Sequence, residues 1–250
     1  MKSMFYSTAL ACLAAVFSGC AANNEAASQP EESQVGTNDS LAIRGDSCTI
    51  KLENVHFTQA INGADTLAVV QGPGKIKFSV GEKKDFFNDP DGKLSNNTAP
   101  VLLSVVDNTK PFTLTAKVTP EFTPTGLYSA GVLYLYVNDS LYHKFCFEQD
   151  ERGKHRVVTV RTRGTSDDNN HDIVTQPYIY MKISSDTKTV ASYYSLDNKN
   201  WQMVRLYKND YPGKIGVGIS AQSPVDKSSV SYFEDLKLES SSVKDFRMGN

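Results

Sequence analysis

Short segments in which apolar and polar residues alternate, separated by turn residues, dominate the chain from residue 48 onward. Such alternation is typical of half-buried β-strands, whereas an amphipathic helix needs apolar residues three and four positions apart. No window of helical length shows an apolar stripe of that kind, and Gly, Pro, Asn and Asp clusters punctuate the segments. We therefore predict about thirteen strands, over residues 48–52, 66–70, 75–80, 101–106, 112–118, 131–137, 141–148, 156–163, 179–184, 189–195, 201–208, 215–220 and 230–238.

These segments favour one all-β domain. Twelve Tyr and twelve Phe, together with many Val and Thr, are residues that fit a pleated sheet. Without helices there are no crossovers for a parallel sheet, so the prediction is a β-sandwich of two antiparallel sheets over residues 47–240, followed by a C-terminal tail at 241–250.

The first 46 residues have a different composition. Met1 and Lys2 precede an apolar run that is too short to span a bilayer, and the run ends in Ser18-Gly19-Cys20. This pattern resembles a bacterial lipoprotein signal, which implies a signal peptide at 1–19 and a lipid on Cys20. The alternative is an ordinary secretory leader in which Cys20 is incidental.

Residues 20–46 contain almost nothing large and apolar, so we predict a flexible tether. With a lipid on Cys20, this arrangement predicts a protein of the bacterial cell envelope, at the outer membrane, whose contact with the membrane is made by the anchor only. The formal net charge of −2 offers no basic surplus for a phosphate backbone, so we expect no nucleic-acid partner. In the mature chain beyond Cys20, Cys48 and Cys146 either form a disulfide or remain free thiols.

Two neighbouring predicted strands carry charged residues on alternate positions. In the strand at 141–148, Lys144 and Glu148 face opposite to the Phe residues between them, and in the strand at 156–163, Arg161 and Arg163 share a face. We expect these four residues on one polar sheet face, which is either a solvated surface with cross-strand ion pairs or the floor of a ligand groove.

The same region carries a resemblance to a known family. The segments 144–148 (Lys-Phe-Cys-Phe-Glu) and 157–170, with its Arg-Gly-x-Ser-Asp-Asp-x-Asn stretch, resemble the "regulation of enolase" family of uncharacterised domains in the concanavalin A-like lectin/glucanase superfamily. Supporting matches are Asp85-Phe86-Phe87, Ala99-Pro100, residues 112–118, 128–132, 194–197, Trp201, 216–218, Ala221-Gln222-Ser223-Pro224 and Phe233-Glu234-Asp235. The resemblance implies a twisted jelly-roll with a concave face and, by association with glycan-cutting enzymes, contact with polysaccharide.

The chain shows no glycosidase signature. A retaining glucanase needs two carboxylates about 5–5.5 Å apart, and neither Glu148-Gln149-Asp150-Glu151 nor Glu234-Asp235 has the spacing that supplies them from one strand face. We therefore assign no catalytic residue. The alternative is a hydrolase or lyase that uses Glu148 with Asp167 or Asp168 as an acid–base pair.

Residues 168–172 alternate oxygen-bearing side chains as a calcium loop does, but Ile173 stands where an EF-hand has Gly. We favour a turn stabilised by Asp and Asn side chains, with structural calcium as the minor alternative and no other metal or cofactor.

Sugar sites combine aromatic platforms with planar hydrogen-bonding groups. We predict that residues 163–170 form a turn that folds over the concave face, and that a polysaccharide or oligosaccharide binds there. The alternative is a protein-interaction module of an envelope complex. The candidate ligand-binding residues are Lys144, Glu148, Arg161, Arg163, Asp167, Asp168, Asn170 and Tyr180.

Overall fold

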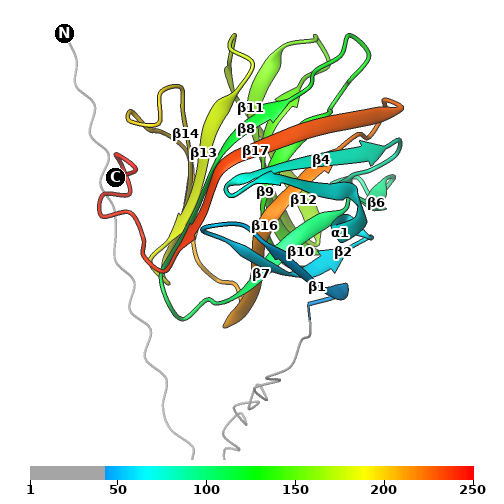
Figure 1. Ribbon diagram of the computed structural model, residues 1–250. Coiled ribbons are helices and arrows are strands. Elements are labelled where there is room, and N and C mark those ends of the chain that lie inside the picture. Colours follow the sequence, from blue (N-terminus) through cyan, green and yellow to red (C-terminus); the bar gives the residue numbers. More distant parts are fainter. Residues whose placement is uncertain (1–42) are drawn as a thin grey trace, which may run out of the picture. The chain divides into compact units, whose positions relative to one another are not determined.

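The larger of two antiparallel sheets carries eight strands (Figure 1). A computed structural model describes residues 43–250 of the chain. In spatial order the strands are β1 (Asp46–Lys51), β2 (His56–Ile61), β7 (Val101–Asp107), β16 (Lys214–Gln222), β9 (Ala130–Asn138), β10 (Leu141–Gln149), β11 (His155–Arg163) and β12 (Thr165–Ile173).

The second sheet packs against the first and carries seven strands. Their spatial order is β15 (Gln202–Lys208), β14 (Thr189–Ser195), β13 (Ile179–Ser185), β8 (Phe112–Pro120), β17 (Ser228–Glu239), β4 (Lys75–Gly81) and β3 (Ala68–Gly72). The one helix of the described residues, α1 (Ala64–Leu67), has four residues and precedes β3. Within residues 43–250, no helix is long and apolar enough to cross a membrane. The predicted all-β sandwich of two antiparallel sheets is confirmed.

The side chains between the two sheets form the inter-sheet core. Phe145 and Phe147 of β10 meet Leu114 of β8 and Met181 of β13 there, all fully buried. This placement follows from the period of two along a strand, which sends every second residue toward the opposite sheet.

A second apolar cluster covers part of the other face of the eight-stranded sheet, which we call the outer face. A short hairpin of β5 (Phe86–Asn88) and β6 (Ser95–Asn97) lies over this face. The ring of Phe86 contacts Tyr134, Tyr136 and Tyr142 edge-on, with ring centroids 5.5–6.2 Å apart. The central strands β9 and β10 are therefore buried on both faces. This explains why the side chains of β9 form a nearly continuous apolar run.

Each predicted strand overlaps an observed one, and four further strands are present: β2, β5, β6 and β12. The predicted turn at residues 163–170 is wrong beyond Gly164. Gly164 makes the tight reversal at a φ of 77°, which glycine adopts without strain, and residues 165–173 then pair with β11 along their length.

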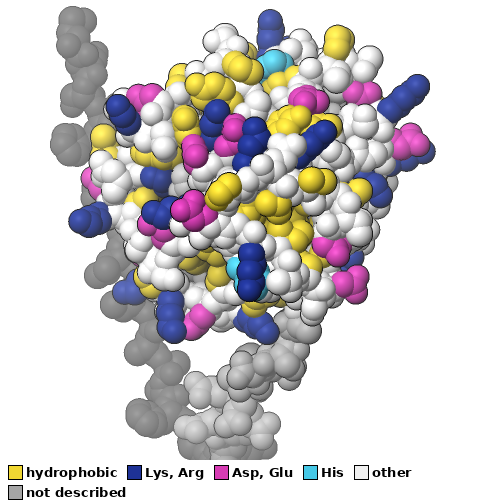
Figure 2. Space-filling view, viewed as in Figure 1, with side chains coloured by type: hydrophobic (Ala, Val, Ile, Leu, Met, Phe, Trp, Pro, Cys, Tyr) yellow, Lys and Arg dark blue, Asp and Glu magenta, His cyan; other side chains and the backbone are white. Residues whose placement is uncertain are grey.

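The ends of the described chain are held by contacts. Ile43 is buried in the cluster under the β5–β6 hairpin, and Val243 and Phe246 pack beside Tyr193 of β14. Of the two alternatives for Cys48 and Cys146, the structure has the free thiols. On the face shown in Figure 2, basic and acidic side chains are interspersed and form no patch of one sign.

Candidate functional site

A cavity of ≈ 560 Å³ opens on the outer face, beside the β5–β6 hairpin. Its floor is formed by strands β10, β11, β12 and β16, and its rim by the loops that follow β4, β8, β10 and β16. Leu94, Tyr128 and Val225, which are among the large apolar side chains most exposed to solvent, all lie at this rim. The lining residues are Lys83, Asp85, Phe87, Leu94, Asn96, Tyr128, Lys144, Glu148, Asp150, Glu151, Val158, Val160, Asp168, Asn170, Gln222, Pro224 and Val225.

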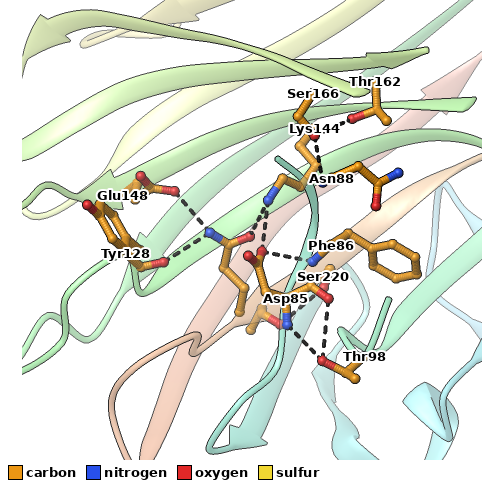
Figure 3. Close-up of polar contacts among 12 residues, drawn as sticks. Asp85, Phe86, Asn88, Thr98, Tyr128, Lys144, Glu148, Thr162, Ser166 and Ser220 are labelled. Atoms are coloured by element: carbon orange, nitrogen blue, oxygen red, sulfur yellow. Dashed lines mark hydrogen bonds and ion pairs between the residues drawn. The ribbon is translucent and has the colours of Figure 1, made fainter. Parts of the chain in front are cut away.

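A chain of buried polar side chains runs along the floor (Figure 3). Lys144 Nζ donates to Asp85 Oδ1 at 2.9 Å and to Gln222 Oε1 at 3.1 Å. The amide nitrogen of Gln222 then donates to Glu148 Oε2 at 2.9 Å. Because one Gln222 amide accepts from the cation and donates to the acid, its orientation is fixed and it couples the two charged groups.

The alternation of β10 places these side chains in the cavity. Lys144, Cys146 and Glu148 point to the outer face while Phe145 and Phe147 fill the inter-sheet core. Lys144 is 2% exposed and Glu148 is 8% exposed, so both ionisable side chains are almost completely removed from bulk water.

Burial changes the acidity of Glu148. Burial raises the pKa of Glu148 to about 8. The nearby Lys144 lowers this pKa, but the carboxylates of Asp168, Asp85 and Asp150 raise it and offset part of the effect of Lys144. At neutral pH Glu148 is therefore mostly protonated and can donate a hydrogen bond.

Lys144 behaves in the opposite way. Burial alone would lower its pKa, but the adjacent carboxylate of Asp85 raises the pKa above that of a free lysine. Lys144 therefore stays charged, and its charge is balanced by Asp85.

Tyr128 is held at the rim in an unusual conformation. Its φ is 60°, in the left-handed region that bulky residues rarely adopt. Its carbonyl accepts a hydrogen bond of 2.9 Å from the Gln222 amide, the residue is 39% exposed, and its ring stands beside Glu148 (Figure 3). Backbone strain of this kind persists where the surroundings fix it, and it is common at ligand sites.

The far wall of the cavity comes from the edge strand β12. Asp168 pairs across the ladder with Val160, and both Asp168 and Asn170 line the cavity. Partial burial raises the pKa of Asp168, although Lys144 opposes that rise. Of the predicted site residues, the structure thus brings together Lys144, Glu148, Asp168 and Asn170.

Arg161, Arg163 and Asp167 do not join this site, and the predicted common face of Arg161 and Arg163 with Lys144 and Glu148 is wrong. Arg161 pairs across the ladder with His143, the neighbour of Lys144, and so points toward the other sheet. Its guanidinium lies 4.3 Å from the Tyr207 ring centroid and 3.0 Å from Asp210.

Arg163 and Asp167, the other two residues outside the site, lie at the same end of the sandwich as Arg161. Arg163 pairs with Asp210 at 2.6 Å, and Asp167 pairs with Arg205 at 2.6 Å. The physical reason is that β11 is apolar on both faces. Alternation correctly separates the residues of β11 into two sets. The set with Val158 and Val160 lies on the outer face, so the set with Arg161 and Arg163 faces the other sheet.

Tyr180 also lies elsewhere. It pairs with Lys117 across the ladder of the seven-stranded sheet and contacts the ring of Tyr178 edge-on at 6.0 Å. The expectation that Tyr180 lies on the same face as Lys144 is therefore wrong.

The structure offers no support for a calcium loop at 168–172. These residues belong to β12, and a register irregularity separates their side chains: Asp168 lines the cavity, whereas Asp172 accepts a 2.6 Å hydrogen bond from Tyr194. Within residues 43–250, no group of three or more His, Cys, Asp or Glu side chains is placed to hold a metal ion.

Three residues of the site were not predicted from the sequence: Asp85, Tyr128 and Gln222. Each lies in a short motif that supported the family resemblance, namely 85–87, 128–132 and 221–224. For Asp85 and Gln222, the signal that could have found them is a polar residue inside such a motif, next to a buried apolar residue.

The chain matches one protein family, described as "Protein of unknown function (DUF1349)", over residues 66–241. No curated protein matches. A functionally unknown protein from Saccharomyces cerevisiae has a similar structure, with a TM-score of 0.65 and 20% identity over 73% of this chain and 95% of that one.

Two larger proteins share the fold over part of their length. The GH43 protein BlXynB from Bacillus licheniformis has a TM-score of 0.56 at 16% identity, and the match covers 74% of this chain but 36% of that one. GH43B of a Bacteroides ovatus xyloglucan PUL has a TM-score of 0.54 at 12% identity, covering 78% of this chain and 40% of that one. At these identities the likeness concerns the β-sandwich fold.

Proposed function

The chain belongs to the DUF1349 family, whose function is unknown, and we propose that it binds carbohydrate, without catalysis, in the cavity on the outer face. The observation that carries the proposal is the buried chain Asp85–Lys144–Gln222–Glu148, which ends beside an exposed aromatic ring at the rim.

The cavity has the chemistry that a sugar ring requires. Tyr128 and Phe87 offer apolar surface for the flat face of the ring. Lys144 has one N–H beyond its bonds to Asp85 and Gln222, and protonated Glu148 has its O–H, so both can donate to sugar hydroxyls. Asp168 and Asn170 can accept from the hydroxyls on the opposite side. The volume of ≈ 560 Å³ lies in the range of small-ligand sites.

The comparisons support this proposal by analogy. Two proteins that share the sandwich fold carry GH43 in their names, and one of them belongs to a xyloglucan PUL. A shared fold does not carry function by itself, so the argument depends on the cavity.

We propose further that the domain is attached to the bacterial cell envelope through a lipid on Cys20 and a tether. Such an anchor would hold the cavity near the polysaccharides of the cell surface, at the outer membrane.

A second candidate function is glycan cleavage with Glu148 as general acid. The observation that favours it is the pKa of about 8, which keeps Glu148 protonated at neutral pH, as a general acid requires. Asp168 is then the partner carboxylate, because Asp167 lies on the other side of β12 and pairs with Arg205.

Incubation of the protein with a panel of polysaccharides, scored for retention and for release of reducing ends, tests both functions. We expect retention without new reducing ends, and we expect Tyr128→Ala and Gln222→Ala to lose retention. Tyr180→Ala and Arg163→Ala are matched controls, since each removes an aromatic or a cation from outside the cavity. Retention that depends on Tyr180 and not on Tyr128 would place the ligand on the other sheet and contradict the proposal.

A further inference from the structure

The walls of the cavity differ from one side to the next, and this difference bears on which part of a glycan chain fits. The first wall is the β5–β6 hairpin, which brings Phe87 into the lining. Asn88 fastens the hairpin to the turns at one end of the floor strands, because its side-chain amide donates to the carbonyls of Asp139 and Gly164, both at 3.1 Å. The backbone N–H of Asn88 also donates to Ser166 Oγ at 2.9 Å (Figure 3). The hairpin therefore closes the cavity at the end where β9 turns into β10 and β11 into β12.

Backbone segments form two further walls. On the β16 side, Lys84 and Ser223 exchange two backbone hydrogen bonds of 2.9 and 3.0 Å, which join the segment before β5 to the end of β16. At the other end of the floor strands, the backbone N–H of Tyr128 donates to the carbonyl of Gln149 at 2.8 Å, and Glu151 lines the cavity beside them. A sugar chain cannot pass through these three sides, because hydrogen-bonded backbone occupies each of them.

The fourth side of the cavity, over β12, is open. Among residues 43–250, β12 is the last strand of the eight-stranded sheet, so no further strand borders it. Burial along the floor follows the same direction. Lys144 and Gln222 are each 2% exposed, whereas Asp168 and Asn170 of β12 keep a large part of their surface exposed. The floor is thus covered near β16 and β10 and reaches solvent at β12.

The covered part of the cavity offers a hydrogen bond that suits the end of a chain. A terminal sugar has a free hydroxyl at the position where an internal sugar continues into its neighbour. Lys144 has one N–H beyond those it donates to Asp85 and Gln222, and a ligand hydroxyl can accept it. A ligand that carries a further sugar at this position loses the hydrogen bond and meets a wall, and closed sites of this kind discriminate strongly.

We propose that the cavity receives the terminal sugar of a glycan chain, with that sugar over Lys144 and Glu148 and the following sugars leaving across β12, and this inference rests on the carbohydrate-binding function proposed above. An internal stretch of a polysaccharide needs two openings, and the described walls leave one. The protein therefore binds chain ends, whose number in a given mass of glycan rises as the chains become shorter.

Binding to samples of one polysaccharide that differ in chain length tests the proposal. Each polysaccharide of the panel that the full chain retains is used intact and after limited acid hydrolysis, with the chain ends of both samples counted. The unbranched members of the panel are β-1,4-xylan, β-1,3-glucan and amylose. When hydrolysis raises the number of ends about tenfold, we expect the mass concentration of glycan at half-saturation to fall about tenfold, since the concentration of sites on the ligand rises by that factor.

Variants at the open side give a second readout. Asn170→Ala should weaken binding of the hexasaccharide of the retained glycan about fivefold, as one neutral hydrogen bond supplies, and should change binding of the monosaccharide less. Tyr128→Ala, on the closed side, should weaken the binding of both. Asn169→Ala is the matched control, because Asn169 is the next residue of β12 along the chain from Asp168 and does not line the cavity.

A mass concentration at half-saturation that hydrolysis leaves unchanged means that internal sugars bind, and it overturns the chain-end inference while carbohydrate binding stands. The same conclusion follows if Asn170→Ala weakens the monosaccharide as much as the hexasaccharide, or weakens neither. If no polysaccharide of the panel is retained, both proposals fail.

Discussion

The Asp85–Lys144 ion pair is buried at the floor of the cavity. The side chains are 12% and 3% exposed, so neither charge can turn to water when its partner is lost. We predict that Lys144→Met lowers the free energy of unfolding by about 3–5 kcal/mol, because it leaves Asp85 buried and uncompensated.

Chemical denaturation measures this loss. The double variant Lys144→Met with Asp85→Leu should recover part of it, since a pair of apolar residues needs no compensation. Lys237→Met is the control, because the Lys237–Glu239 pair is 49% and 41% exposed and such pairs contribute about 0–1 kcal/mol. Equal losses in the two single variants would contradict a buried pair.

Glu148 links stability to pH. Its pKa in the folded protein is raised from 4.5 to about 8, so between these values the folded state binds more protons than the unfolded state. Stability from this group is full below pH 4.5 and is lost as the pH rises through about 8, with a slope approaching about 1.4 kcal/mol per pH unit. Glu148→Gln should remove this decline. Parallel pH profiles for the parent and the variant would mean that Glu148 is ionised in the folded state.

At the scale of elements, alternation predicted most of the sandwich, because a period of two is visible wherever one face of a strand is buried. It failed where both faces are occupied. On β11 it separated Val158 from Arg161 correctly, but the sequence alone could not say which set faces the other sheet. Lys144 and Glu148 were found because they flank the Phe-Cys-Phe segment of β10 and alternate with its two Phe residues. Asp85 and Gln222 come from distant elements whose approach depends on the fold.

The strand β12 shows a different limit. Its residues, from Thr165 to Ile173, have the composition of a turn, and most are exposed. They form a strand because β11 offers backbone partners to most of them. At the edge of a sheet polar side chains are favoured, since they discourage pairing with other chains. Composition could not reveal this, because the pairing partner decides the conformation.

The β5–β6 hairpin is the element that covers the outer face, and Phe86 holds it there. We predict that Phe86→Ala destabilises the fold by about 3–5 kcal/mol, since it removes a ring that is fully buried against three tyrosines. Hydrogen exchange should show faster exchange over residues 86–97. Phe87→Ala is the control: Phe87 is half-buried and lines the cavity, so its loss should weaken ligand binding more than stability. Unchanged exchange in Phe86→Ala would mean that other contacts hold the hairpin.

At the scale of the whole molecule, the described fold has two apolar layers where a simple sandwich has one. The inter-sheet core holds the two sheets together, and the cluster under the β5–β6 hairpin converts one outer face into the wall of a cavity. The buried polar chain of the site lies on the outer face, beside the hairpin cluster, so the site depends on parts of the chain from residue 85 to residue 222. The described chain begins at Ile43, next to the hairpin.

The proposed anchor gives the last prediction. If Cys20 carries a lipid, Cys20→Ala should move the protein from the membrane fraction to the soluble fraction of a bacterial host. The reason is that the remaining segment at 20–46 has no apolar stretch that could anchor the protein in a bilayer. Cys12→Ala is the matched control, since Cys12 lies inside the expected signal peptide and its loss should leave the protein with the membranes. The released Cys20→Ala protein should retain carbohydrate as the parent does, because the cavity is built from residues 83–225. A Cys20→Ala variant that stays with the membranes, from a parent that incorporates no labelled fatty acid, would show that the domain is held by another contact.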